Sequence, residues 1–171
     1  MKTVALPCRT GLAPIAALVL PALLAVFPLG GWSADLPKQG TFTVTYTDAG
    51  TSPAGFDTGG GKWAFIFDTR LITTNDAGSG LFHNMTGRCI GSGIGDSLTG
   101  YCLFTDKDGD KFVEPLNRQA GATKGTATLT GGTGKYKGIE GSLEFQDVPL
   151  ADTGPGQYNH IGKKKGSYKL P

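Results

Sequence analysis

Hydrophobic and polar side chains alternate along most of the chain after residue 38. The clearest case is the segment 41–47, where Phe42, Val44 and Tyr46 alternate with threonines. Because successive side chains of a β-strand point to opposite faces, the three apolar residues share one face and the threonines share the other. The pattern predicts a half-buried strand.

Similar β-rich segments recur, separated by clusters of glycine, asparagine and aspartate, and helical periodicity is almost absent. Within the segment 62–72, Trp63, Phe65 and Phe67 are expected to point the same way, and the residues 75–78 read as a turn. We expect eight strands, near residues 41–47, 62–72, 81–89, 98–105, 111–116, 124–130, 136–146 and 158–170.

Eight consecutive strands favour an all-β fold, and specifically an eight-stranded antiparallel barrel. Closure of the sheet removes the exposed edges that an open sheet would have to protect. A sandwich of two sheets is the alternative and fits the pattern less well. The residues 49–61, which include Pro53 and three consecutive glycines, are expected to form a connection beside the barrel mouth.

The first 34 residues have the layout of a secretory signal peptide. They carry two basic residues, no acidic residue, and an apolar run that prolines interrupt. A membrane-spanning helix is the alternative, but prolines inside the run argue against it. We expect cleavage after Ser33 or Ala34, a single domain over residues 35–171, no membrane attachment after cleavage, and a periplasmic or secreted protein.

The charge balance gives little support to nucleic-acid binding. The chain has 16 basic and 14 acidic residues, but Lys2 and Arg9 belong to the predicted signal peptide, so the remainder has a net charge of about zero. Proteins that bind nucleic acids concentrate basic residues on one face. The basic run 163–165 is expected to be a solvated strand edge or tail.

Two cysteines, Cys89 and Cys102, follow the predicted signal peptide, whereas Cys8 lies within it. In an exported protein we expect these two to form a disulfide. A zinc site is the alternative, but two cysteines and two distant histidines do not supply closely spaced ligand pairs. If the cysteine segments form a hairpin, its midpoint falls between Gly95 and Asp96, which is a recognised turn dipeptide.

An acidic segment suggests a metal site. Asp106, Asp108 and Asp110 alternate along the chain and could converge on a hard cation such as Ca²⁺. The glycine of this segment does not have the spacing of an EF-hand. The favoured interpretation is a two-residue Asp-Gly turn that makes Thr105 and Phe112 cross-strand neighbours. No cofactor other than Ca²⁺ is suggested.

No residues form a recognisable catalytic constellation. The glycine-rich segments 91–95 and 131–136 lack the strand-to-helix context of nucleotide-binding loops. The candidates for acid–base chemistry are His83, His160, Asp68, Glu140, Glu144 and the tyrosines. His83 is expected to be a structural residue on a strand. Glu140 and Glu144 share one side of a strand, and a solvated exterior is favoured over an interior acid–base pair. The sequence leaves the catalytic residues unassigned.

The segment 131–141, Gly-Gly-Thr-Gly-Lys-Tyr-Lys-Gly-Ile-Glu-Gly, resembles the glycine-rich signature of the allene oxide cyclase and dirigent barrel superfamily. The chain also resembles exported bacterial members of that superfamily, in which a cysteine-bearing strand pair and an Asp-x-Asp-Gly-Asp turn precede the signature. The resemblance implies an eight-stranded antiparallel barrel with a central cavity. The signature glycines are structural, and no pocket residue of the plant enzymes can be placed on this sequence. Neither cyclase activity nor control of radical coupling is therefore transferred.

These observations favour a non-enzymatic exported barrel that binds a small apolar ligand or a partner surface. The alternatives are a cofactor-free enzyme of the cyclase or isomerase type and a structural or assembly protein. A cavity lined only by aliphatic and aromatic groups would favour binding, whereas an enclosed acidic residue beside a tyrosine or histidine would favour catalysis. A filled interior would favour a structural role.

Overall fold

A computed structural model describes residues 36–171, and the predicted signal peptide lies outside the described residues. No helix in the described part of the chain has the length and apolar character needed to cross a membrane. The strands are β1 (Gln39–Gly59), β2 (Lys62–Asn75), β3 (Met85–Ile94), β4 (Ser97–Thr105), β5 (Lys111–Gln119), β6 (Lys124–Leu129), β7 (Glu140–Pro149) and β8 (Gln157–Lys169).

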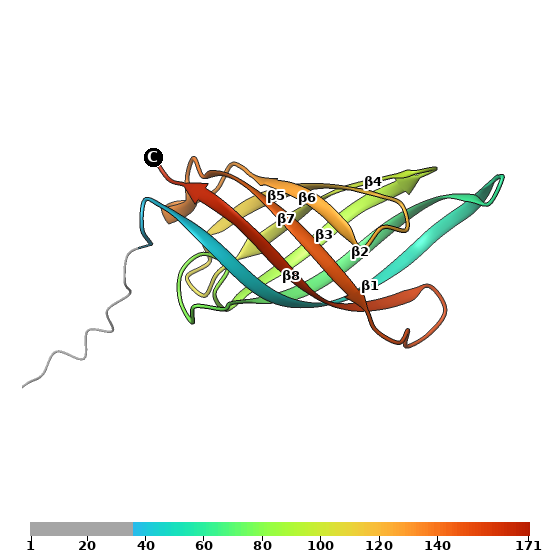
Figure 1. The fold of residues 1–171 in the computed structure, drawn as a ribbon, viewed down its shortest axis with the longest axis horizontal. Coiled ribbons are helices and arrows are strands. Elements are labelled where there is room, and N and C mark those ends of the chain that lie inside the picture. Colours follow the sequence, from blue (N-terminus) through green and yellow to red (C-terminus); the bar gives the residue numbers. More distant parts are fainter. Residues whose placement is uncertain (1–35) are drawn as a thin grey trace, which may run out of the picture. The chain divides into compact units, whose positions relative to one another are not determined.

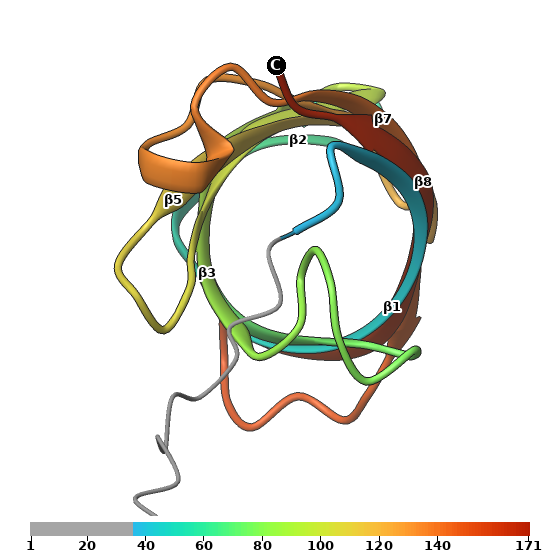
Figure 2. The same ribbon diagram turned by 90° about the vertical axis from the view of Figure 1, so that its left-hand side faces the viewer.

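These strands form one closed antiparallel barrel (Figures 1 and 2). Each strand pairs with the next along the chain, and β1 pairs with β8 to close the sheet. The predicted all-β, eight-stranded antiparallel barrel is therefore confirmed, and the sandwich is wrong.

Successive side chains of each strand point alternately into the barrel and to the outside. Phe42, Val44 and Tyr46 are all buried, as predicted for one face of β1. Glycines at other inward positions leave room for these large groups: a Cβ at Gly162 would collide with the Tyr46 ring. The interior is thus built from large side chains that lie over glycines of neighbouring strands.

The residues 49–61 do not form the predicted connection. They continue β1 as far as Gly59 and pair with β2, with a register shift between Thr51 and Ala54 that accommodates Pro53. The β1–β2 hairpin projects from one end of the barrel (Figure 1). Trp63 near its tip is consequently 55% exposed, so the predicted inward series of β2 reaches the core only at Phe65 and Phe67.

The residues 81–84 were expected in a strand but belong to a loop between β2 and β3 that folds across the other end of the barrel (Figure 2). The loop is held by side chains of β2: Thr73 Oγ1 donates to the Phe82 carbonyl, and Asn75 Nδ2 donates to the Leu81 carbonyl. Phe82 has a φ of 67°. Its fully buried ring offsets the cost of that left-handed backbone.

Aromatic rings close this end of the barrel, and we call this cluster the aromatic floor. The Phe82 ring lies 4.9 Å from the Phe104 ring and 5.2 Å from the Phe112 ring, measured between centroids. Both contacts have edge-to-face geometry, which is favourable for aromatic pairs. The aromatic floor consists of Phe42, Phe82, Phe104, Phe112 and Tyr136.

One further strand limit and one cross-strand pairing differ from the prediction. The strand expected from residue 136 begins only at Glu140, as β7. Tyr136 is instead the last residue of a short 3₁₀ helix, and a turn follows it. Thr105 pairs with Lys111, not with Phe112, because the connection between β4 and β5 spans five residues. The predicted two-residue turn at this position is therefore wrong.

The disulfide is confirmed. Cys89 on β3 lies directly opposite Cys102 on β4, and the two side chains are bonded. Ile94 pairs with Ser97, so the hairpin turns at Gly95 and Asp96, as predicted. Gly95 has a φ of 60°, which glycine adopts without steric cost.

We predict that the double variant Cys89→Ala and Cys102→Ala keeps the strand content but loses about 2–4 kcal/mol of unfolding free energy, because the bond restricts the unfolded chain. Urea unfolding of the oxidised wild type and the variant, followed by circular dichroism, measures the difference. An unchanged midpoint would contradict a stabilising role of the bond.

Candidate functional site

A cavity of about 310 Å³ lies inside the barrel, above the aromatic floor. Its deepest charged group is the Lys164 ammonium, which lies 4.6 Å from the centre of the Phe104 ring. Toward the other end it is lined by Arg118, one residue before the end of β5, and by Tyr158, the second residue of β8. The interior is thus neither filled nor uniformly apolar.

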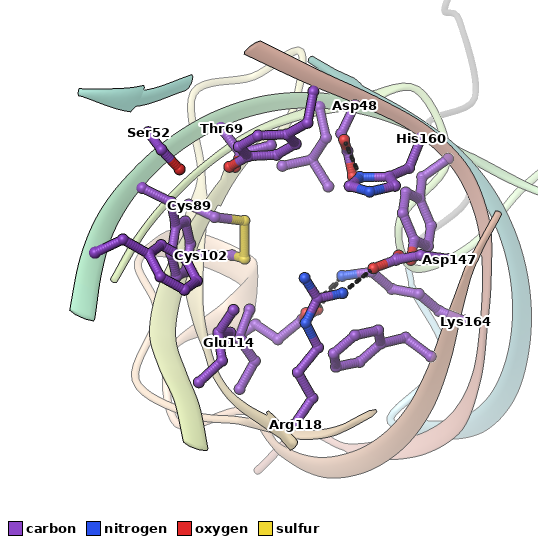
Figure 3. A pocket seen from close by; sticks show the side chains of 18 residues that line it. Asp48, Ser52, Thr69, Cys89, Cys102, Glu114, Arg118, Asp147, His160 and Lys164 are labelled. Carbon is purple, nitrogen blue, oxygen red and sulfur yellow. Dashed lines mark hydrogen bonds and ion pairs between the residues drawn. A yellow bond between two sulfur atoms is a disulfide. The ribbon is translucent and has the colours of Figure 1, made fainter. Parts of the chain in front are cut away.

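The cavity has two chemically different sides (Figure 3). One side comes from β2, β3 and β4, and we call it the apolar wall: Phe65, Phe67, Leu71, Leu98 and the Cys89–Cys102 disulfide. The other comes from β1, β5, β7 and β8, and we call it the polar wall: Asp48, Glu114, Arg118, Asp147, His160 and Lys164. Leu116 and Phe145 add apolar surface beside the polar wall.

A fully enclosed ion pair lies deepest in the polar wall. Lys164 Nζ lies 2.5 Å and 2.6 Å from the two carboxylate oxygens of Glu114, and the two side chains are 4% and 1% exposed. Burial raises the pKa of Glu114, and the Lys164 charge opposes that rise. The ammonium also lies over the Phe82 and Phe104 rings. Such a pair holds its partners in one arrangement, because either charge alone would be costly to bury.

Asp147 on β7 accepts two hydrogen bonds, one at each carboxylate oxygen. The Tyr46 hydroxyl donates to Oδ1, and Arg118 Nη1 donates to Oδ2 at 2.5 Å. Burial and the Asp147 charge raise the pKa of Tyr46, so its hydroxyl stays protonated. Arg118 Nε is buried and has no partner among the residues that the structure describes.

His160 on β8 faces Asp48 on β1 across the seam that closes the barrel. His160 Nδ1 lies 3.0 Å from Asp48 Oδ1, and the side chains are 14% and 11% exposed. This hydrogen bond favours the cationic ring and raises the pKa of His160, although burial opposes it. Next to it, the Tyr158 ring lies over Gly50 of β1, and its hydroxyl is hydrogen-bonded to Thr69, which ties β8 to β2 over the strand between them.

Comparison with known proteins bears on the fold. No protein-family model matches the chain, and no curated protein matches it. A solved structure of a pterocarpan synthase dirigent protein superposes with a TM-score of 0.50 at 12% sequence identity, covering 78% of this chain and 93% of that one. The chain has a dirigent-like barrel fold. At this identity the match concerns the fold alone, as does the predicted resemblance to the allene oxide cyclase and dirigent superfamily.

The predicted calcium ligands lie outside the cavity of this dirigent-like barrel, in the loop between β4 and β5. Lys135 Nζ lies 2.5 Å from Asp106 Oδ2 and 2.6 Å from Asp108 Oδ2, and Asp110 accepts a hydrogen bond from the Lys135 backbone. The lysines at 107 and 135 lower the pKa of Asp108 to about 2. Within residues 36–171, no three acidic, histidine or cysteine side chains are grouped to hold a metal ion. The Ca²⁺ site stays a prediction.

Most other sequence candidates lie away from the cavity. His83 lies in the loop that covers the aromatic floor, not on a strand as expected. Glu140 and Glu144 are exposed on the outer face of β7, which was the favoured interpretation. Asp68 also lies on the outside, where it pairs with Arg88. Of the named candidates, His160 and two of the tyrosines line the cavity.

Most residues of the polar wall were not among the candidates predicted from the sequence. Lys164 was expected to be solvated with its neighbours, but it is buried because it is the inward residue of the 163–165 run. Asp48 likewise continues the inward series of β1 that starts at Phe42. The available signal was a charged residue at a position whose strand neighbours two residues away point inward.

We predict that Glu114→Leu costs about 3–5 kcal/mol of unfolding free energy, because it leaves Lys164 buried without a partner. The double variant Glu114→Leu and Lys164→Met should recover most of that loss. Urea unfolding measures the stability of both variants. The control is the double variant Glu144→Leu and Lys165→Met, because these two residues are paired on the outer face of β7 and β8. It should change the unfolding free energy by less than about 1 kcal/mol. A double variant as unstable as the single one would contradict this account.

The raised pKa of His160 predicts a pH dependence. A histidine in the unfolded chain has a pKa of about 6.5. At pH values below this pKa, the protonated His160 contributes its full stabilisation of the fold. This contribution is lost as the pH rises through the higher folded-state pKa. The stability difference between the wild type and His160→Gln should therefore shrink from about pH 5 to about pH 9, as urea unfolding can measure. Asp48→Asn should lower the His160 pKa in an NMR titration, and an unmoved pKa would refute the pairing.

Proposed function

We propose that this dirigent-like barrel binds a small ring-containing organic molecule that carries oxygen atoms. The observation that carries the proposal is the two-sided cavity, in which the apolar wall faces the polar wall. Rings can bury their faces against Phe65, Phe67 and Leu98, while oxygen atoms receive hydrogen bonds from the opposite side. The volume of about 310 Å³ is at the lower end of the range for ligand sites, which suits one small molecule.

This proposal departs from the purely apolar ligand that the sequence favours. An apolar molecule in this cavity would remove water from Arg118 and His160 without replacing the hydrogen bonds that water supplies. Leaving a polar or charged group unpaired costs free energy, and the cost is larger for a charged one. A ligand with one polar side avoids that cost.

We also propose that the protein acts outside the cytoplasm, in the periplasm or as a secreted protein. The predicted signal peptide supports this location. The Cys89–Cys102 bond supports it too, because structural disulfides persist mainly in oxidising compartments.

A second candidate is a cofactor-free enzyme of the cyclase or isomerase type. The enclosed pairs Tyr46–Asp147 and His160–Asp48 favour it, because each places an acidic residue beside a group that can give or take a proton. Binding is common to both candidates. Conversion of a bound compound, followed by mass spectrometry of the ligand, separates them.

The proposed binding is tested with a panel of small ring compounds followed by NMR shift changes. We expect shifts at residues of the two walls, with binding abolished by Leu98→Trp, which places an indole in the cavity. Ile90→Trp is the matched control, because it adds the same bulk on the outer face of the adjacent strand and should leave binding intact. Binding that survives Leu98→Trp, or a panel without any cavity binder, would overturn the proposal.

A further inference from the structure

Arg118 has hydrogen-bond donors that the protein does not use. One terminal nitrogen, Nη1, donates to Asp147, while the other terminal nitrogen points toward the centre of the cavity (Figure 3). Nε is buried without a partner among the described residues. An arginine guanidinium presents donors in a planar fork that matches a carboxylate or another oxyanion.

When its ring is protonated, His160 offers a second donor to the same cavity. Its Nδ1 is engaged with Asp48, and its Nε2 forms no hydrogen bond within residues 36–171. The acceptors of the polar wall are largely occupied: Asp147 uses both oxygens for Tyr46 and Arg118, and Glu114 uses both for Lys164. The unused groups are therefore mainly donors, which select a ligand that accepts hydrogen bonds.

The net charge of the polar wall depends on one proton. Glu114 with Lys164 is neutral as a pair, and so is Asp147 with Arg118. Asp48 with His160 is neutral only when the ring is protonated and is otherwise a net negative charge. An anion that enters the cavity is thus opposed when His160 is neutral and accepted when it is protonated.

We infer that the ligand of this cavity is a ring-containing oxyanion, such as an aromatic carboxylate, held between Arg118 and His160 and taken up together with one proton on His160. The inference rests on the proposed function, because it names the ligand class of the same cavity. The proton comes from solvent and returns to it when the ligand leaves, so no covalent bond to the ligand changes.

The surroundings of His160 are consistent with this coupling. Asp48 on β1 and Asp147 on β7 favour its cationic form, whereas Arg118 on β5 opposes it. The Tyr158 ring, on the same strand, lies tilted against the His160 ring at 5.4 Å between centroids and carries no charge while its hydroxyl is protonated. A bound anion that contacts Arg118 would offset the repulsion from this guanidinium and hold the proton more firmly on His160.

The experiment uses matched acids and alcohols as probes: cinnamate with cinnamyl alcohol, phenylacetate with 2-phenylethanol, and 1-naphthoate with 1-naphthalenemethanol. Calorimetric titration near pH 8 in two buffers of different ionisation enthalpy measures protons taken up per ligand. We expect at least one acid to bind more tightly than its alcohol and to take up a fraction of a proton that increases as the pH rises above the folded-state pKa of His160. Its affinity should fall by up to about tenfold per pH unit above the folded-state pKa of His160.

His160→Gln keeps a side chain that donates hydrogen bonds but removes the titration, so it should abolish the proton uptake. Lys165→Gln, on the outer face of the same strand, is the matched control and should retain it. Alcohols that bind as well as the acids, or uptake that persists in His160→Gln, would overturn the oxyanion inference and leave the proposed binding intact. If none of these probes and no member of the ring-compound panel binds, the proposed function itself fails.

Discussion

The pairing of β1 with β8 is the constraint on which the rest of the structure depends. It closes the sheet, and its register fixes which side chains meet inside. Asp48 lies opposite His160, and Tyr46 lies opposite Gly162, whose missing side chain leaves room for the tyrosine ring. A shift of one residue would turn the inward groups of the shifted strand to the outside. The same register therefore determines both the core and the candidate site.

The interior combines a stable aromatic floor with a polar wall that is costly to bury. The edge-to-face rings of Phe82, Phe104 and Phe112 supply apolar burial at one end. Above them, the carboxylates of Glu114, Asp147 and Asp48 each face a cationic or proton-donating partner. A barrel of this size could fill its interior with apolar side chains alone, as many small barrels do. The charged cavity thus supports the proposed binding of a ligand.

Much of the fold follows from the sequence, because local alternation determines it. The inward series Phe42, Val44 and Tyr46 and the Cys89–Cys102 hairpin needed no knowledge of distant contacts. The polar wall could not be derived in this way. Glu114 and Lys164 are 50 residues apart, and only barrel closure and register bring them together. The loop that carries Phe82 was mistaken for a strand because its apolar residues pack over the barrel end, a tertiary contact that no local pattern records.

We propose that the space between the two walls is a site for a small molecule. The most direct measurement is a crystal structure of the protein purified from its own host, at a resolution that separates ligand from water. The account predicts continuous density for one small ring-containing molecule against Phe65, Phe67 and Leu98, with its polar end toward Arg118 and His160. A cavity occupied only by side chains that have moved into it, or by water alone even in crystals grown with the ring-compound panel, would contradict it.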